Sequence, residues 1–294
     1  MPKSIHLFSI FALLGLLSVQ APVVGQALVP YTLQLDSKQL EQQGLNLAQD
    51  AVQLVRFQQY DLALPRAALA TQLAPKSYQT WFILGSLYVQ SKELDKGITA
   101  LQQAQALAPK ESGIYFTLGS ARFQKGDYAT AVADLERGLK IKSDVPEALF
   151  DLGNAYYMLK QFDKAIAQYE KAVAQEKKFW PAINNIGLVK YEQGDVKGAL
   201  DKWQAAIAID DEAAEPRLAA AVALYSRGEQ EKGLAMGEAA IRLDSRYADL
   251  DFLKENLWGE RLIAETKKFL ENPRIQASLA QSQELPIQGE QAPQ

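Results

Sequence analysis

Cysteine is absent from this chain of 294 residues, and histidine occurs once, as His6 near the N-terminus. Without thiols the protein forms no disulfides and offers no cysteine for a lipid anchor. Beyond His6 the chain cannot build the usual zinc sites, Ser-His-Asp triads or Cys-His pairs, because each of them needs histidine or cysteine. We therefore expect no metal, no cofactor and none of these catalytic centres.

The chain also lacks a strong charge of either sign. Its net charge is −4 and it has no run of lysine and arginine, so the basic footprint of a nucleic-acid-binding protein is missing. Carboxylates are the remaining catalytic option, at Asp210, Asp211 and Glu212 and at Glu229 and Glu231. We interpret the first group as a solvated turn and the second as favourable charge at a helix N-terminus. No glycine-rich phosphate loop follows a strand, and the protein is predicted not to be an enzyme.

Long hydrophobic runs are missing except at the N-terminus. Residues 5–19 carry no charge, Lys3 precedes them, and small-residue cleavage patterns end at Ala21 and Ala27. This run is shorter than the roughly 20 residues that span a bilayer. Residues 1–27 are thus predicted to be an export signal, which places the protein in a periplasm or thylakoid lumen. The alternative is an uncleaved segment that tethers the protein to a membrane through residues 5–19.

Glycine, in contrast, returns at a fixed interval. Gly85, Gly119, Gly153 and Gly187 are 34 residues apart, and each follows a leucine or isoleucine. Glycine inside a helix costs about 1 kcal/mol relative to alanine, so four glycines in phase need a packing reason. Close approach of a neighbouring helix is such a reason. A fixed period of this length indicates a stacked helical array.

Larger side chains recur with the same period. In residues 78–111, two groups at helical spacing predict two amphipathic helices that are joined by a short turn. The first group is Trp81, Leu84, Gly85 and Tyr88, and the second is Gly97, Leu101 and Ala104.

Turn residues lie between the two predicted helices of several units. Gly126-Asp127, Gly194-Asp195 and Gly228-Glu229 occupy this junction. Glycine suits a left-handed residue that ends the first helix, and aspartate suits the cap of the second.

The recurring W-x-x-L-G-x-x-Y and A-x-x-x-[LYW]-x-x-A patterns resemble the tetratricopeptide repeat (TPR) family over residues 44–247. The resemblance implies an all-α, right-handed α-solenoid of about six helical hairpins. Arg122 and Lys190 depart from the family at an expected tyrosine position. Four further departures replace an expected proline: Ser143, Lys177, Asp211 and Ser245. The predicted units are 44–77, 78–111, 112–145, 146–179, 180–213 and 214–247.

The flanking segments differ in character from the repeats. Residues 28–43 are predicted to form a linker and the start of the first helix. Residues 248–271 are predicted to form one helix that caps the exposed end of the array, with a partner-binding helix as the alternative. The glutamine-rich residues 272–294 are predicted to be disordered. The second helix of the last unit contains Gly233 and Gly237, and we expect it to be the loosest of the array.

In the TPR family, partners usually lie along a concave face that the first helices line. Positions that map to this face form two series, with small polar residues between them. One interpretation is that the aromatics complete the packing between units. The other is a groove with aromatic walls and a polar floor for an extended or helical peptide. The first series is Phe82, Phe116, Phe150 and Asn184, the second is Val89, Phe123, Tyr157, Tyr191 and Tyr225, and the polar residues are Ser86, Ser120 and Asn154, with Asp151 and Asn185 nearby.

These features predict a non-enzymatic scaffold that binds a protein or peptide and no nucleic acid. Lysine and arginine are scarce at the groove positions, so the clamp that some TPR domains use for acidic C-termini is not expected. Residues 253–270 resemble the C-termini of cyanobacterial and plastid TPR proteins, which implies a role in assembling a photosynthetic membrane complex. A permanent structural subunit of an envelope or membrane complex is the alternative. Membrane contact is expected only through the N-terminal segment or a membrane-protein partner.

Overall fold

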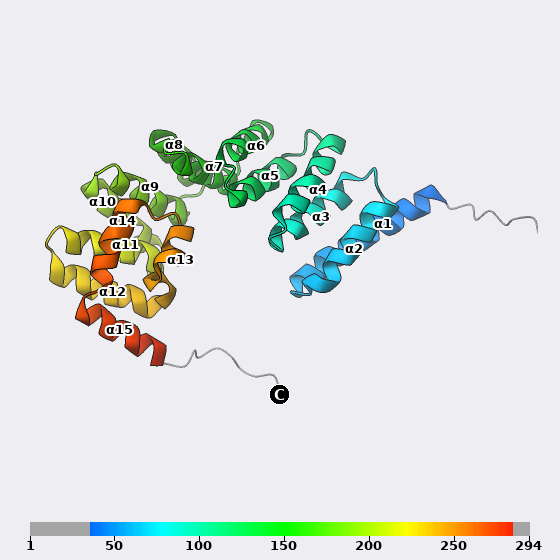
Figure 1. Ribbon diagram of the computed structural model, residues 1–294. Coiled ribbons are helices and arrows are strands. Elements are labelled where there is room, and N and C mark those ends of the chain that lie inside the picture. The colour runs from blue at the N-terminus through cyan, green and yellow to red at the C-terminus, as the bar shows by residue number, and fades with distance from the viewer. Residues whose placement is uncertain (1–35, 285–294) are drawn as a thin grey trace, which may run out of the picture. The chain divides into compact units, whose positions relative to one another are not determined.

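The computed structural model describes residues 36–284, and its regular structure in this range is entirely helical (Figure 1). The chain divides into two units between Asp36 and Ser37, and the account below concerns the second. The predicted export signal (1–27) and the linker up to residue 35 lie outside the described residues. Within the described range, no helix has the length and apolarity that a bilayer span requires.

Twelve helices pair into six antiparallel hairpins. Each hairpin packs through its second helix against the first helix of the next one. The hairpins are α1 Ser37–Arg56 with α2 Tyr60–Leu73, α3 Tyr78–Gln90 with α4 Leu94–Leu107, α5 Ser112–Lys125 with α6 Tyr128–Ile141, α7 Pro146–Met158 with α8 Phe162–Gln175, α9 Trp180–Glu192 with α10 Val196–Ile209, and α11 Ala214–Ser226 with α12 Gln230–Leu243. The all-α repeat architecture is thereby confirmed, and α3, α5, α7, α9 and α11 begin at the first residues of the predicted units.

The periodic glycines lie where the two helices of a hairpin touch. A Cβ added to Gly153 would lie 2.4 Å from the Tyr169 ring, and one added to Gly187 would lie 2.5 Å from the indole nitrogen of Trp203. Both large side chains are fully buried. Glycine therefore makes room for the largest residue of the facing helix, which explains why it is placed inside these helices despite its low helix propensity.

The turn inside each hairpin uses a left-handed residue, which the sequence predicts at the three glycine-containing turns. Gly126 and Gly194 have φ values of +85° and +86°. The following Asp127 and Asp195 cap the second helix, since their carboxylates accept hydrogen bonds from backbone amides three residues later. Three other hairpins form the same turn without glycine, at Gln58, Lys92 and Lys160.

The charged departures at the tyrosine position are compensated by acidic neighbours. Arg122 Nε lies 2.8 Å from Asp134 Oδ2, and Lys190 Nζ lies 2.8 Å from Asp195 Oδ2. Each ion pair joins the first helix of a hairpin to its second helix or to the cap of that helix, so the array tolerates both substitutions.

The C-terminal part of the fold corrects two predictions. Instead of one helix over 248–271, the chain forms a 3-10 turn, Ser245–Ala248, and two helices, α13 Leu250–Glu255 and α14 Glu260–Leu270. The break follows from the segment 256–259, where Leu257 has a left-handed φ of +64°.

Disorder from residue 272 onward is also wrong for the described part of that tail. Helix α15 spans Pro273–Glu284 and packs on α12. Ile275 is fully buried, and Arg274 lies 2.8 Å from Glu231 and 3.0 Å from Glu238. Because α12 supplies this surface, a polar, glutamine-rich segment is ordered without a strong pattern of its own.

Helix α12 packs closely against its neighbours, although its two glycines predict a loose helix. A Cβ at Gly233 would meet the Ala221 carbonyl at 2.7 Å, and one at Gly237 would meet the Phe269 ring at 2.4 Å. The two glycines therefore allow close contact on two sides of the helix. α11 takes one side, and α14 and α15 take the other.

The glycine contacts lead to a stability prediction. Gly153→Ala is expected to lower the free energy of unfolding by about 1–3 kcal/mol, because the added methyl overlaps the Tyr169 ring. Gly113→Ala is the matched control, since its Cβ would come no closer than 3.7 Å to a neighbour. That variant should be neutral or gain up to about 1 kcal/mol. Urea unfolding of both variants measures the difference, and equal stabilities would refute the packing role of Gly153.

Candidate partner-binding groove

The first helices line one side of the array, which we call the first-helix face (α1, α3, α5, α7, α9 and α11). At its N-terminal end an open apolar cavity of about 170 Å³ lies between α1 and α3. The predicted groove residues Phe82 and Ser86 line it, together with Val52 and Val55 of α1. Val52 is 36% exposed, so this cavity opens to the surface.

The middle of the face combines packing and exposure. Phe116 packs against Gly138 of its own hairpin, and the Phe123 ring lies 5.3 Å from that of Tyr128. Phe150 meets Phe179, the residue just before α9, edge to face at 5.4 Å. All three phenylalanines from the first helices, and Ser120, are half-buried. The packing interpretation therefore accounts for one side of these rings, and the other side remains accessible.

The C-terminal end of the face is filled by the protein itself. Helix α14 packs on α9 and α11, where Figure 1 shows it in orange beside them. The predicted groove residues Asn184 and Tyr191 are 0% and 1% exposed, and Tyr157, further along the face, is 8% exposed. These three side chains are buried in the structure and do not form an open surface.

A glutamate of the repeats holds the start of α14. The N-cap residue of this helix, Gly259, has no capping side chain. Glu192 of α9 replaces it, since its two carboxylate oxygens accept hydrogen bonds from the backbone amides of Arg261 at 3.3 Å and Leu262 at 3.2 Å. A negative charge at the N-terminus of a helix also interacts favourably with the helix dipole. A Cβ at Gly259 would overlap Glu192, so glycine permits the contact.

Two tyrosines of the groove series bind the rest of α14. The Arg261 guanidinium lies 4.6 Å from the centre of the Tyr191 ring and donates to the Tyr191 carbonyl at 3.2 Å. The Tyr191 hydroxyl donates to Glu265, and burial together with this carboxylate raises the tyrosine pKa. Tyr225 meets the fully buried Phe269 edge to face at 5.3 Å.

Amide side chains near the middle of the array form a polar network rather than an open floor. Asn154 Oδ1 accepts from the Tyr169 hydroxyl at 2.8 Å and from Asn185 Nδ2 at 3.0 Å. Asn184 Nδ2 donates to Asn185 Oδ1 at 3.1 Å. Buried polar groups need such partners, so these amides hold three helices in register, and only the half-buried Asn154 remains near the surface.

The network ends at a buried carboxyl that reaches the C-terminal segment. Glu215 accepts a hydrogen bond from the indole nitrogen of Trp258 at 3.1 Å, and Asn184 also bonds to this carboxyl. Burial raises the pKa of Glu215 to about 7. Nearby, burial and the charge of Glu147 raise the pKa of Asp151 to about 6. Glu215 thus links repeat six to the segment that precedes α14.

Sequence reasoning did not find Glu192, Glu215, Trp258 or Gly259. Their partners lie 43 to 70 residues away along the chain, and no repeat signature marks them. In the described part of the chain, no group of three or more His, Cys, Asp or Glu side chains is placed to hold a metal ion.

The buried carboxyl predicts a dependence of stability on pH. The folded state binds the Glu215 proton with a pKa of about 7, against an ordinary value of 4.5. The free energy of unfolding should therefore fall as pH rises from about 4.5 to about 7. Glu215→Gln carries no charge, and its amide oxygen can still accept from Trp258. We expect this variant to be more stable than the parent by roughly 1–3 kcal/mol at pH 8 and equal to it at pH 4.

Urea unfolding between pH 4 and pH 8 measures this effect. Asp151 contributes to the slope of both proteins, so the difference between them isolates Glu215. Glu212→Gln, in an exposed turn, is the control and should retain the slope of the parent. If Glu215→Gln keeps that slope as well, the carboxyl does not titrate as proposed.

Comparison with family models identifies repeats in the middle of the chain. Two tetratricopeptide-repeat models match residues 119–160 and 146–179. A model of the ChAPs, described as Chs5p-Arf1p-binding proteins, matches residues 25–124. Comparison with curated proteins yields no match.

Solved structures share the hairpin array at low sequence identity. The type IV pilus biogenesis factor PilW has a TM-score of 0.64 and 20% identity, and the match covers 73% of this chain and 98% of PilW. PilF of Pseudomonas aeruginosa has a TM-score of 0.61 and 14% identity, with 74% and 99% covered. YrrB, a TPR protein with an unusual peptide-binding site, has a TM-score of 0.51 and 19% identity, with 69% and 97% covered. The family models thus identify tetratricopeptide repeats within residues 119–179, and the solved structures share the all-helical repeat array.

Proposed function

We propose that this protein is a non-enzymatic scaffold that binds a peptide or protein segment along the first-helix face of α1, α3, α5 and α7. The observation that carries the proposal is α14, a helical segment already bound on the same face at α9 and α11. It shows how side chains at these repeat positions can hold a helix. The TPR fold itself suggests protein–protein interaction, and YrrB is an example of that fold with a peptide-binding site.

The free part of the face offers similar chemistry to a ligand. Tyr191 and Tyr225 hold α14 through ring contacts, and Phe123 lies 68 residues before Tyr191 at the equivalent repeat position. Val52 and Phe82 add apolar area at the cavity between α1 and α3. Aromatic and aliphatic surface with a few polar groups favours an amphipathic helix or an extended peptide.

Position-specific crosslinking tests this proposal. A photoreactive amino acid at Ser86 or Ser120 should crosslink to a partner in extracts of the native compartment, whereas one at Thr99 of α4 should not. Ser86→Arg should reduce the crosslink at Ser120 at least tenfold, because the long side chain fills the groove. Thr99→Arg is the matched control and should leave it unchanged.

The result at Thr99 decides the outcome. Equal crosslinking at Thr99 and Ser86, or a crosslink at Ser120 that Ser86→Arg does not affect, would exclude this face as the binding site. The thermal unfolding temperature of each variant shows whether a loss of binding results from a loss of folding.

We further propose that the protein is exported, on the basis of the N-terminal pattern in residues 1–27. N-terminal sequencing of the protein from its native host is expected to start at residue 22 or 28, after Ala21 or Ala27. An N-terminus that retains residues 5–19 would instead support the tethered form.

In that compartment the scaffold would assist assembly of a membrane complex. The alternative is that it is a permanent structural subunit of an envelope or membrane complex. Size-exclusion chromatography of native extract separates these roles. Substoichiometric capture supports the assembly factor, and constant co-elution with a large complex supports the subunit.

A further inference from the structure

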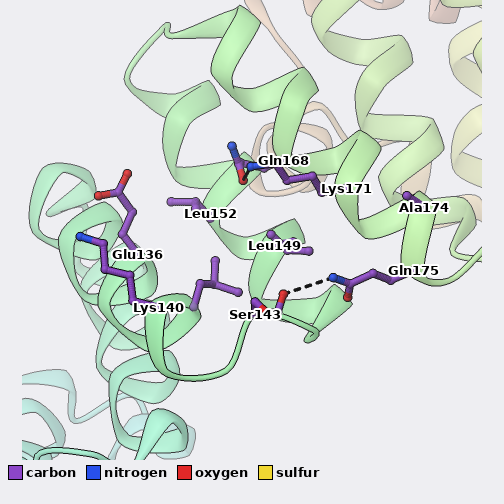
Figure 2. Close-up of a pocket in the computed structure, with 10 residues that line it drawn as sticks. Glu136, Lys140, Ser143, Leu149, Leu152, Gln168, Lys171, Ala174 and Gln175 are labelled. Atoms are coloured by element: carbon purple, nitrogen blue, oxygen red, sulfur yellow. Dashed lines mark hydrogen bonds between the residues drawn. The ribbon is translucent and has the colours of Figure 1, made fainter.

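A second cavity lies mainly between two second helices of the array. It has a volume of about 740 Å³ and lies between α6 and α8, with Leu149 and Leu152 of α7 among its lining residues (Figure 2). Both leucines are nearly fully buried, at 4% and 3% exposure. The rim carries polar and charged side chains from the two second helices, including Lys140 and Lys171.

The cavity coincides with a missing aromatic residue. Trp81 and Tyr115 occupy one repeat position, and each donates a hydrogen bond to the backbone carbonyl six residues earlier, at Pro75 (2.9 Å) and Pro109 (3.0 Å). Leu149 stands at this position in the next repeat. Leucine is smaller than either ring and has no donor. The equivalent carbonyl, that of Ser143, instead accepts from Gln175 Nε2 at 3.2 Å (Figure 2).

Lys171 on the rim has no aromatic ring of the described chain beside it, because Leu149 replaces the tyrosine of the preceding repeat. In the preceding repeat, the Arg137 guanidinium lies 5.1 Å from the centre of the Tyr115 ring. Lys171 is 34 residues after Arg137 and borders the cavity, with Leu149 in place of the tyrosine. Its ammonium group bonds only to Gln168, at 3.3 Å, among the described residues.

The rim has a net positive charge available to a ligand. Glu136 accepts a hydrogen bond from the Tyr156 hydroxyl at 2.6 Å and is therefore already engaged. Neither Lys140 nor Lys171 has an ion-pair partner within residues 36–284. Because the two lysines outnumber Glu136, the rim attracts an acidic group that enters with a ligand.

We propose that this cavity is a second binding site, which accepts a tryptophan or tyrosine side chain that is flanked by acidic residues on a partner protein. The ring takes the place of the missing repeat aromatic, above Leu149 and beside Lys171. Its N–H or O–H group donates to the Ser143 carbonyl in place of Gln175. A neighbouring carboxylate pairs with Lys140. This site is separate from the first-helix face and does not depend on it.

A pair of short peptides provides the probe. N-acetyl-Asp-Trp-Asp-amide is titrated into the isotope-labelled chain that carries residues 28–294, and N-acetyl-Asp-Ala-Asp-amide is the matched control. NMR should show shifts of backbone amides in residues 139–143 and 168–175 with the tryptophan peptide. We expect it to bind at least tenfold more tightly than the alanine peptide, because only it buries a ring. Equal binding of the two peptides, or shifts elsewhere in the chain, would overturn the proposal.

Variants of the cavity separate ring binding from charge. Leu149→Trp restores the aromatic side chain of the repeat. It should weaken binding of the tryptophan peptide at least tenfold while the chain stays folded. Lys140→Glu with Lys171→Glu should weaken binding of this peptide severalfold without filling the cavity. This double variant therefore tests the proposal even if Leu149→Trp does not fold. Lys177→Glu with Lys178→Glu, an equal change of charge at two exposed positions that do not line the cavity, is the control. Affinity that neither cavity variant reduces would refute the site.

Discussion

Close contact between a glycine of one helix and a large side chain of the next is the constraint on which the array depends. Gly153 faces Tyr169, and Gly187 faces Trp203. These two hairpins bury a large aromatic side chain against a glycine, so their helices approach closely. The 34-residue period of the glycines follows from this contact.

Contacts between a glycine and a larger side chain also attach the C-terminal segment. Gly237 accepts the ring of Phe269, and Gly259 lets Glu192 cap the first turn of α14. The predicted roles are consequently divided between two helices. α15 covers the end of the array at α12, whereas α14 occupies the first-helix face at α9 and α11. The face at α9 and α11 is thus filled by the chain itself, and the proposed partner is left with α1, α3, α5 and α7.

The two proposed sites differ in how they arise from the repeat. The groove uses side chains that recur in phase, such as Phe82 on the wall of its cavity. The cavity between α6 and α8 arises where the repeat is broken, because Leu149 replaces the ring that Tyr115 supplies one unit earlier. A departure from the repeat pattern therefore leaves the fold intact and changes the surface that it offers.

The sequence by itself determined the helical hairpins, their boundaries and the Gly-Asp turns at residues 126–127 and 194–195, because these depend on periodic contacts between near neighbours. Only the tertiary structure decided which groove residues stay open. Tyr191 is covered by a segment some 70 residues away, which no local pattern reports. Helix α15 was missed for the same reason, since a polar segment is ordered by the surface that receives it. Repetition can be recognised in a sequence, whereas contacts between distant segments become visible only in the folded chain.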